Sequence, residues 1–177
     1  NYPIKKIVEN GSTHVLFQKE VMREEYALHG RSFQTNDLMI EKQLQEYAAA
    51  DYISTPSSFT HQSFLTHGIS SNKLIQVPYG VDITAFYTLP KKDKKFRIII
   101  CGNIGLRKGI QYLLRAFDEL NLRNAELYII GPVDDIVKPL MKKYTASNII
   151  WAGSFSENQL VHEYAKGSVF CLPSIEE

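Results

Sequence analysis

The chain has 177 residues, of which 44% are hydrophobic and 22% charged, and its formal net charge at pH 7 is +1. This composition is ordinary for a globular protein, and a net charge so close to zero gives no overall field that would attract nucleic acid or an anionic membrane. Any binding of phosphate must therefore be local. No apolar run approaches the roughly 20 residues of a membrane span, so we expect neither a transmembrane segment nor a signal peptide.

The two cysteines, Cys101 and Cys171, both lie in apolar runs that predict strands. Buried free thiols are a better interpretation of this pair than a disulfide, because a reducing cytoplasm keeps such thiols unpaired. A metal site is also disfavoured, because neither cysteine has a second ligand at the spacing of such a site.

The first half of the sequence predicts short strands that alternate with helices. Polar residues form a turn at Glu9–His14, and Ser12 or Thr13 is expected to cap the helix that follows. A serine pair, Ser57 and Ser58, is expected to cap a later helix. The expected strands of this half are Ile4–Val8, Tyr52–Thr55 and Lys73–Val77, and the expected helices are Val15–Leu28, Leu38–Ala50 and Phe59–His67.

A charged stretch with a proline, Thr88–Lys95, has the composition of a linker, so we place a domain boundary between residues 88 and 89. Beyond it, regular alternation of strands and helices predicts an α/β fold with a parallel sheet and right-handed crossovers. The chain begins with Asn1 and stops directly after a predicted strand, so we expect a piece of a longer protein. The expected strands here are Arg97–Cys101, Glu126–Ile130, Asn148–Trp151 and Ser168–Leu172, and the expected helices are Ile110–Leu120, Ile136–Tyr144 and Glu157–Lys166.

The segments that follow the predicted strands of the second half are the candidate ligand site. Ligands of open parallel sheets bind outside the carboxyl ends of the strands. Three of the four segments carry a glycine close after the strand, which lets a ligand approach the backbone. The segments are Gly102–Gly109, Gly131–Asp135, Gly153–Ser156 and Pro173–Glu177.

The strongest candidate among them is Gly102–Gly109, with the sequence GNIGLRKG, where Arg107 and Lys108 precede a predicted helix. Backbone N–H groups and the positive end of the helix favour an anion there, and the two cations add full charge. The glycine spacing differs from the dinucleotide fingerprint, and Gly109 stands where a P-loop has Ser or Thr. We interpret the loop as a site for the diphosphate of a nucleotide-linked substrate; a solvated turn with two surface cations is the alternative.

Three further features have both a functional and a plain interpretation. The acids of Pro173–Glu177 could accept sugar hydroxyls or balance the loop cations, although a frayed acidic terminus explains them better when they are taken alone. His14 could face a cleft as a hydrogen-bond donor or acid, whereas a single histidine more often serves packing. Pro78–Asp82 is a rigid turn that could contact a ligand. No residue spacing indicates a metal site or a nucleic-acid platform.

These motifs, in this order, resemble the retaining GT-B glycosyltransferases of glycosyltransferase family 4. The resemblance implies two Rossmann-like domains that face each other across a cleft, one for the acceptor and one for the nucleotide-sugar donor. Residues 1–88 would be the last part of the acceptor domain, and residues 89–177 the first half of the donor domain. The segments that carry the resemblance are Ala50-Asp51 with Ser57, Val77–Phe86, Gly102–Phe117, Leu127–Gly131 and Ile149–Glu177.

The resemblance also implies roles for individual residues. Arg107 and Lys108 match the cations that bind the donor diphosphate, and Glu177 matches the first Glu of a Glu-x7-Glu motif, which contacts the donor sugar. The second Glu of that motif would lie beyond Glu177. His14 stands where many members have a histidine near the reacting sugar. The implied donor-binding residues are Gly102, Asn103, Gly105, Gly131, Gly153, Ser154, Phe155 and Ser174.

The implied activity is transfer of a sugar from a nucleotide-sugar donor to an acceptor with retention of anomeric configuration, without a metal or cofactor. The acceptor would be a sugar, a lipid-linked molecule or another small molecule. A cytoplasmic location is expected, and peripheral contact with the inner face of a membrane is left open. The alternatives are a sugar-nucleotide epimerase or phosphorylase of the same fold, or a non-catalytic nucleotide-binding module. We expect a chain of this extent not to turn over by itself.

Overall fold

The computed structural model describes residues 4–176, which form two units. The first unit comprises residues 4–80 together with Glu176, and the second comprises residues 81–175. This division lies earlier in the chain than the boundary that we placed between residues 88 and 89. Each unit has its own parallel sheet, so the predicted α/β fold is confirmed.

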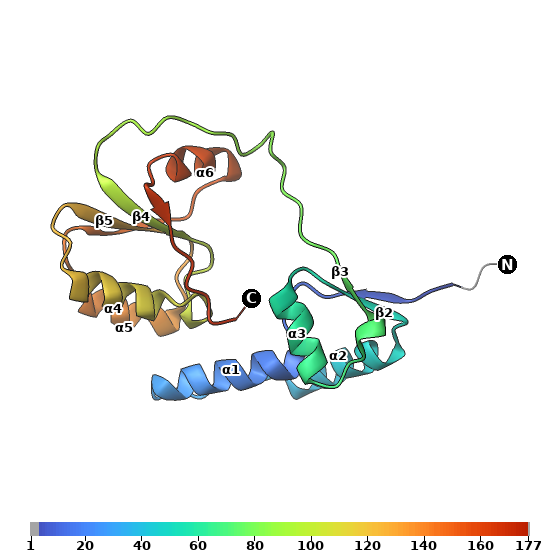
Figure 1. Cartoon of the computed structure of the whole chain (residues 1–177). Helices are drawn as coiled ribbons and strands as arrows, with labels where there is room; N and C mark the ends of the chain where they lie inside the picture. The colour runs from blue at the N-terminus through green and yellow to red at the C-terminus, as the bar shows by residue number, and fades with distance from the viewer. Residues whose placement is uncertain (1–3, 177) are drawn as a thin grey trace. The chain divides into compact units, whose positions relative to one another are not determined.

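The first unit is a parallel sheet in the order β1-β2-β3 with helices packed on one side (Figure 1). Register aligns Ile7 with Tyr52 and Ile53 with Leu74. Ile53 and Phe64 are fully buried in its core. Its elements are β1 (Ile7–Glu9), α1 (Val15–Leu28), α2 (Asp37–Ala49), β2 (Tyr52–Thr55), α3 (Ser58–Thr66), a 3₁₀ turn (Ser71–Lys73) and β3 (Leu74–Gln76).

The helix starts of this unit are capped by side chains. Ser57 caps α3, as predicted, with its hydroxyl accepting from the N–H of Thr60 at 3.1 Å. The cap of α1 differs from the prediction, because His14 occupies it in place of Ser12 or Thr13. The Nδ1 atom of His14 accepts a hydrogen bond from the N–H of Leu16 at 3.3 Å.

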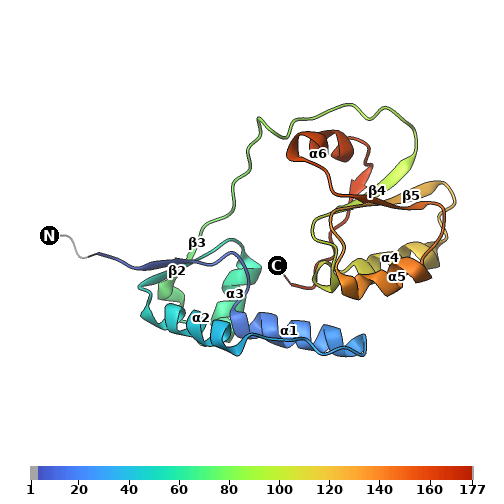
Figure 2. The ribbon, with the colours of Figure 1, turned by 180° about the vertical axis from the view of Figure 1, so that it is seen from behind.

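The second unit is a parallel sheet in the order β6-β5-β4-β7, with α4 and α5 on one face and α6 on the other (Figures 1 and 2). Apolar side chains such as Ile100, Leu127 and Ile129 point toward α4 and form the core there. Its elements are β4 (Phe96–Cys101), a 3₁₀ turn (Leu106–Lys108), α4 (Ile110–Leu120), β5 (Ala125–Ile130), a 3₁₀ turn (Asp135–Val137), α5 (Lys138–Lys143), β6 (Ile149–Gly153), α6 (Glu157–Tyr164) and β7 (Val169–Phe170).

The element that differs most from its prediction is the helix expected at Ile136–Tyr144. It begins as a 3₁₀ turn and becomes α-helical only at Lys138. Pro139 accounts for this start, because proline lacks an N–H and fits an α-helix only in its first turn. Most strand bounds also differ from the prediction by one to three residues. The larger differences are that β1 begins at Ile7, β6 continues to Gly153 and β7 covers only Val169–Phe170.

The two cysteines are free thiols, as predicted, but both are half-buried and not fully buried as expected. Cys171 packs against the core beside α4. Within residues 4–176, no helix combines the length and the apolar character that crossing a membrane requires.

The substitution Leu114→Ala is expected to destabilise the second unit by about 2–5 kcal/mol. The Leu114 side chain of α4 is fully buried in the core, so its truncation leaves a cavity. The matched control is its neighbour Arg115, whose pair with Glu119 is exposed, so Arg115→Ala should cost less than about 1 kcal/mol. Urea unfolding followed by fluorescence of Trp151, the chain's single tryptophan, measures this unit. Equal losses in the two variants would contradict the assignment of this core.

Candidate functional site

Three glycines lie side by side at the carboxyl ends of β4, β5 and β6. The N–H of Gly131 donates to the carbonyl of Gly153 at 2.8 Å, and the N–H of Gly102 donates to the carbonyl of Ile130 at 3.1 Å. A Cβ atom on Gly131 would stand 1.8 Å from the carbonyl oxygen of Gly102, so no other residue fits there without displacing the backbone. Gly131 is therefore buried against Gly102, whereas the space for a side chain is open at Gly102 and Gly153.

The segment after β4 is held against the segment after β5 by main-chain hydrogen bonds. The N–H of Ile104 donates to the carbonyl of Pro132 at 2.8 Å, and the N–H of Asp134 donates back to the carbonyl of Ile104 at 3.0 Å. Ile104 is fully buried, while Asn103 beside it is exposed. Gly105 abuts the Asp134 side chain. The structure thus brings the predicted donor-binding residues of these two segments together.

Arg107 and Lys108 lie in the 3₁₀ turn that leads into the first turn of α4. Leu106 is buried, and its carbonyl accepts a hydrogen bond from the side chain of Gln111 at 3.0 Å. Arg107 is exposed and Lys108 is half-buried. Both cations therefore stand at the positive end of the helix dipole, where an anion is favoured.

The cation turn packs directly against the segment that follows β7. The N–H of Ile175 donates to the carbonyl of Arg107 at 2.9 Å. Gly109 has a φ of 70°, and a Cβ atom there would stand 1.9 Å from the carbonyl oxygen of Pro173. The candidate segment Gly102–Gly109 thus packs against residues 173–175 of a second candidate segment, Pro173–Glu177. Within residues 173–175, Ser174 is half-buried.

Gly153, Ser154 and Phe155 continue the same edge beyond β6. Gly153 has a φ of 77° and turns the chain out of the strand. Ser156 then starts α6 through a capping box with Gln159. This turn, whose residues were implied to bind the donor, therefore begins beside Gly131, and its role toward a ligand stays a prediction.

His14, the fourth catalytic candidate with Arg107, Lys108 and Glu177, lies in the first unit. Its ring is 2% exposed and stacks on His67 at a centroid distance of 4.5 Å. Burial, and to a smaller extent the neighbouring His67, lower the pKa of His14 to about 4, so the ring is neutral at pH 7. The ring also contacts Tyr47 and Phe64, and its Nδ1 atom caps α1. Glu177 lies outside the described residues.

Sequence reasoning missed a buried carboxylate in the first unit. Glu176 is 1% exposed, and its Oε1 accepts hydrogen bonds from the hydroxyls of Ser12 at 2.7 Å and Thr13 at 2.5 Å. Gln18 donates to its Oε2 at 3.0 Å. The acids of the final segment are candidates on sequence, but no local pattern predicts that Glu176 is buried.

Among residues 4–176, no cluster of His, Cys, Asp or Glu side chains has the arrangement needed to hold a metal ion. The charge available to a phosphate at the edge of the second sheet is instead that of Arg107 and Lys108, together with the dipole of α4.

In a comparison with known families, residues 83–177 match the family described as "Glycosyl transferases group 1". No curated protein matches the chain. Among solved structures, Anabaena Alr3699/HepE in complex with UDP and glucose has a TM-score of 0.67 at 15% identity, covering 79% of this chain and 42% of that one.

Two further structures are similar over nearly the whole chain. The lipopolysaccharide outer core galactosyltransferase WaaB has a TM-score of 0.56 at 22% identity, covering 96% of this chain and 50% of that one. WaaG, a glycosyltransferase involved in lipopolysaccharide biosynthesis, has a TM-score of 0.60 at 15% identity, with 97% and 52% covered. The chain thus spans about half the length of these structures. At such identities the likeness concerns the fold, and it confirms the predicted GT-B type.

Gly109 and Gly153 of the second unit have nearly the same φ. Because Gly109 packs on Pro173, we expect its substitution by alanine to destabilise the fold more than that of Gly153. Gly153→Ala adds a Cβ in open space and should cost about 1–2 kcal/mol for the left-handed backbone alone. Gly109→Ala adds a clash with the Pro173 carbonyl and should cost a further ~1–3 kcal/mol. Urea unfolding monitored at Trp151 measures both variants. If Gly109→Ala were no worse than Gly153→Ala, this close contact would not exist.

Proposed function

Because the chain belongs to the group 1 glycosyl transferases, we propose that it is part of an enzyme that moves a sugar from a nucleotide-sugar donor to an acceptor. One observation carries this proposal. Arg107 and Lys108 stand at the start of α4, and their turn is packed against Pro173–Ile175 at the edge where ligands of parallel sheets bind. We assign the donor to this second unit and the acceptor to the first.

The two cations suit the diphosphate of the donor. Both side chains carry a full positive charge at neutral pH, and the helix start behind them adds a favourable partial charge. Arg107 can offer two parallel N–H donors to phosphate oxygens, while Lys108 acts as a compact charge. The open space beside Gly102 and Gly153 leaves room for the rest of the donor to lie close to the sheet.

In the transfer step, the main requirement is to stabilise the negative charge that develops on the leaving diphosphate. The bond between the anomeric carbon and the diphosphate oxygen breaks, and its electron pair leaves with the diphosphate. The acceptor hydroxyl oxygen forms the new bond to the anomeric carbon and releases its proton. Negative charge therefore grows on the diphosphate, where Arg107 and Lys108 would stabilise it without a metal. Retention requires the acceptor to enter on the face that the diphosphate leaves, by front-side attack or through a short-lived ion pair.

The solved structures suggest the first donor to test. The HepE structure contains UDP and glucose, and the pneumococcal O-GlcNAc transferase GtfA was solved with UDP and GlcNAc. We therefore take UDP as the first nucleotide and compare it with GDP and ADP. If the chain binds one of these nucleotides, but no longer protein that contains it transfers a sugar, the chain is the nucleotide-binding module instead.

Removing the loop cations is expected to weaken UDP binding strongly. Each charge-assisted contact is worth about 1.5–3 kcal/mol, so Arg107→Ala and Lys108→Ala should each lower affinity by about tenfold or more. Arg115→Ala, which removes an exposed cation elsewhere on α4, is the matched control and should bind as the native chain does. Calorimetric titration with UDP measures all three. Undiminished affinity in the Arg107/Lys108 double variant would refute the diphosphate site.

Chelation of divalent metals is expected to leave UDP affinity unchanged, because side-chain cations take the role of a metal in this proposal. The measurement is the same titration with and without EDTA, followed by addition of Mg²⁺ or Mn²⁺. A clear gain in affinity on adding either ion would show that the site needs a metal to neutralise the diphosphate.

A further inference from the structure

A cavity of the second unit lies away from the glycine-rich edge. It has a volume of about 510 Å³ and is bordered by the chain before β4, by Tyr128 of β5 and by the end of α6. Arg97, near the amino-terminal start of β4, forms part of its wall. The donor site proposed above uses the carboxyl ends of the same strands, so this cavity is separate from it and has no part in that proposal.

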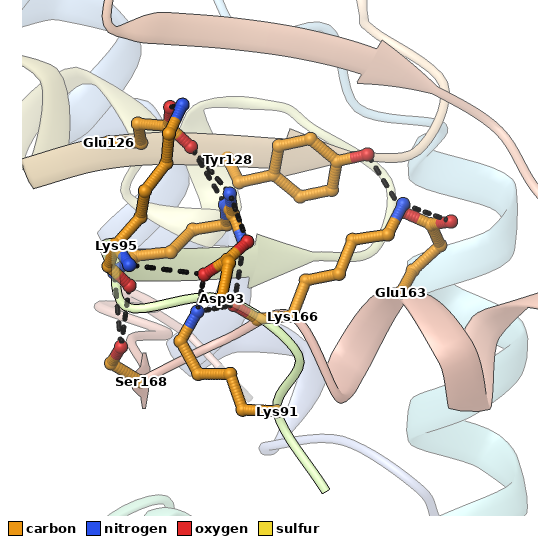
Figure 3. Close-up of polar contacts among 9 residues, drawn as sticks. Lys91, Asp93, Lys95, Glu126, Tyr128, Glu163, Lys166 and Ser168 are labelled. Atoms are coloured by element: carbon orange, nitrogen blue, oxygen red, sulfur yellow. Dashed lines mark hydrogen bonds and ion pairs between the residues drawn. The ribbon is translucent and has the colours of Figure 1, made fainter. Parts of the chain in front are cut away.

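The buried charges of the cavity wall are compensated by one another. Arg97 is 7% exposed and lies opposite Glu126 in the strand register, with its Nη2 atom 2.7 Å from the Glu126 carboxylate. Its Nη1 atom donates to the carbonyl of Lys166 at 2.7 Å, and Asp93 pairs with the same guanidinium at 3.3 Å. Figure 3 shows Asp93 and Glu126 within this group of polar contacts.

The ring of Tyr128 is fixed by a second compensated pair. Its hydroxyl donates to the Glu163 carboxylate at 2.7 Å, and the Lys166 ammonium binds that same carboxylate at 2.6 Å (Figure 3). The Lys166 nitrogen and the guanidinium carbon of Arg97 each lie 5.7 Å from the ring centroid. Tyr128 thus lines the cavity with a ring whose hydroxyl is held by Glu163, and both neighbouring cations have a counter-charge.

Two further basic residues of the wall, unlike Arg97 and Lys166, form no ion pair with a carboxylate of residues 4–176. Lys92 and His162 both border the cavity and are exposed. Among the described residues, neither side chain takes part in a hydrogen bond, an ion pair or a ring contact. The remaining wall is largely apolar, with Leu89, Pro90 and Ala165 beside the Tyr128 ring. An incoming anion would therefore meet cationic and N–H groups that no carboxylate of the fold already neutralises.

We propose that this cavity binds a small organic anion with a flat apolar body. The apolar body lies on the Tyr128 ring against Leu89 and Ala165, and the anionic group lies at the mouth near Lys92 and His162. The volume falls within the roughly 300–1,000 Å³ of small-molecule pockets, which is far more than an inorganic phosphate fills. A rigid ring of fixed orientation favours a planar ligand, because stacking needs no further ordering of the protein.

The test compares 2-naphthoate with 2-naphthamide, which has nearly the same shape but no charge. Each is titrated into the ¹⁵N-labelled chain and followed by amide chemical shifts. The naphthoate is expected to shift the signals of residues 89–93 and 162–166 and to bind about threefold to fivefold more tightly than the amide, the range of an exposed ion pair. Absence of shifts in these two segments, or equal affinity for both compounds, would overturn the proposal.

Variants locate the binding group. Lys92→Gln is expected to remove most of the preference for naphthoate over naphthamide, and His162→Gln part of it. Ala165→Phe fills the apolar wall and should abolish binding of both compounds. Lys142→Gln, which changes an exposed lysine of α5 on the opposite face of the sheet, is the control and should behave as the native chain. A preference for naphthoate that survives both Lys92→Gln and His162→Gln would show that the anion binds elsewhere.

Circular dichroism and Trp151 fluorescence confirm that each variant is folded before it is titrated. Lys92 and His162 are surface side chains without described partners, so their replacement does not disturb the Arg97 and Lys166 contacts. If Ala165→Phe fails to fold, Leu89→Asp provides the second test of the apolar wall. It places a like charge beside the anion and should weaken naphthoate binding more than naphthamide binding.

Discussion

The close approach of main-chain atoms at the carboxyl edge of the second sheet determines how its loops can be arranged. Gly131 lies against the carbonyl of Gly102, and Gly109 lies against the carbonyl of Pro173. In both places a side chain would occupy the space of a backbone atom, so the loops can come together only because these residues have no Cβ. The cations of the 3₁₀ turn owe their position to this packing.

Local patterns were sufficient to predict most elements, and non-local contacts explain where they failed. Val15–Leu28 is helical over the predicted range because its apolar spacing and the polar turn before it agree. The predicted cap of that helix was wrong. The hydroxyls of Ser12 and Thr13 instead bind the carboxylate of Glu176, more than 160 positions further along the chain. Propensity within a short window contains no information about such a partner.

The candidate site shows the same limit for charged residues. The cations of the glycine loop could be predicted, because a strand, glycines and a helix start surround them in sequence. Arg97 lies in an apolar strand and gave no such signal, yet it is buried and paired with Glu126. Its environment depends on which strand lies next to β4 and in which register, and sheet order is a property of the whole unit.

The hydrogen bond from Ile175 to the carbonyl of Arg107 joins the cation turn to the segment after β7. Together with the contact of Gly109 on Pro173, it leaves the two segments little freedom to shift independently. A ligand group that contacts one segment therefore also restricts the other. The free energies with which two parts of one ligand bind these segments should consequently not be additive, and the coupling must be reciprocal, as thermodynamic linkage requires.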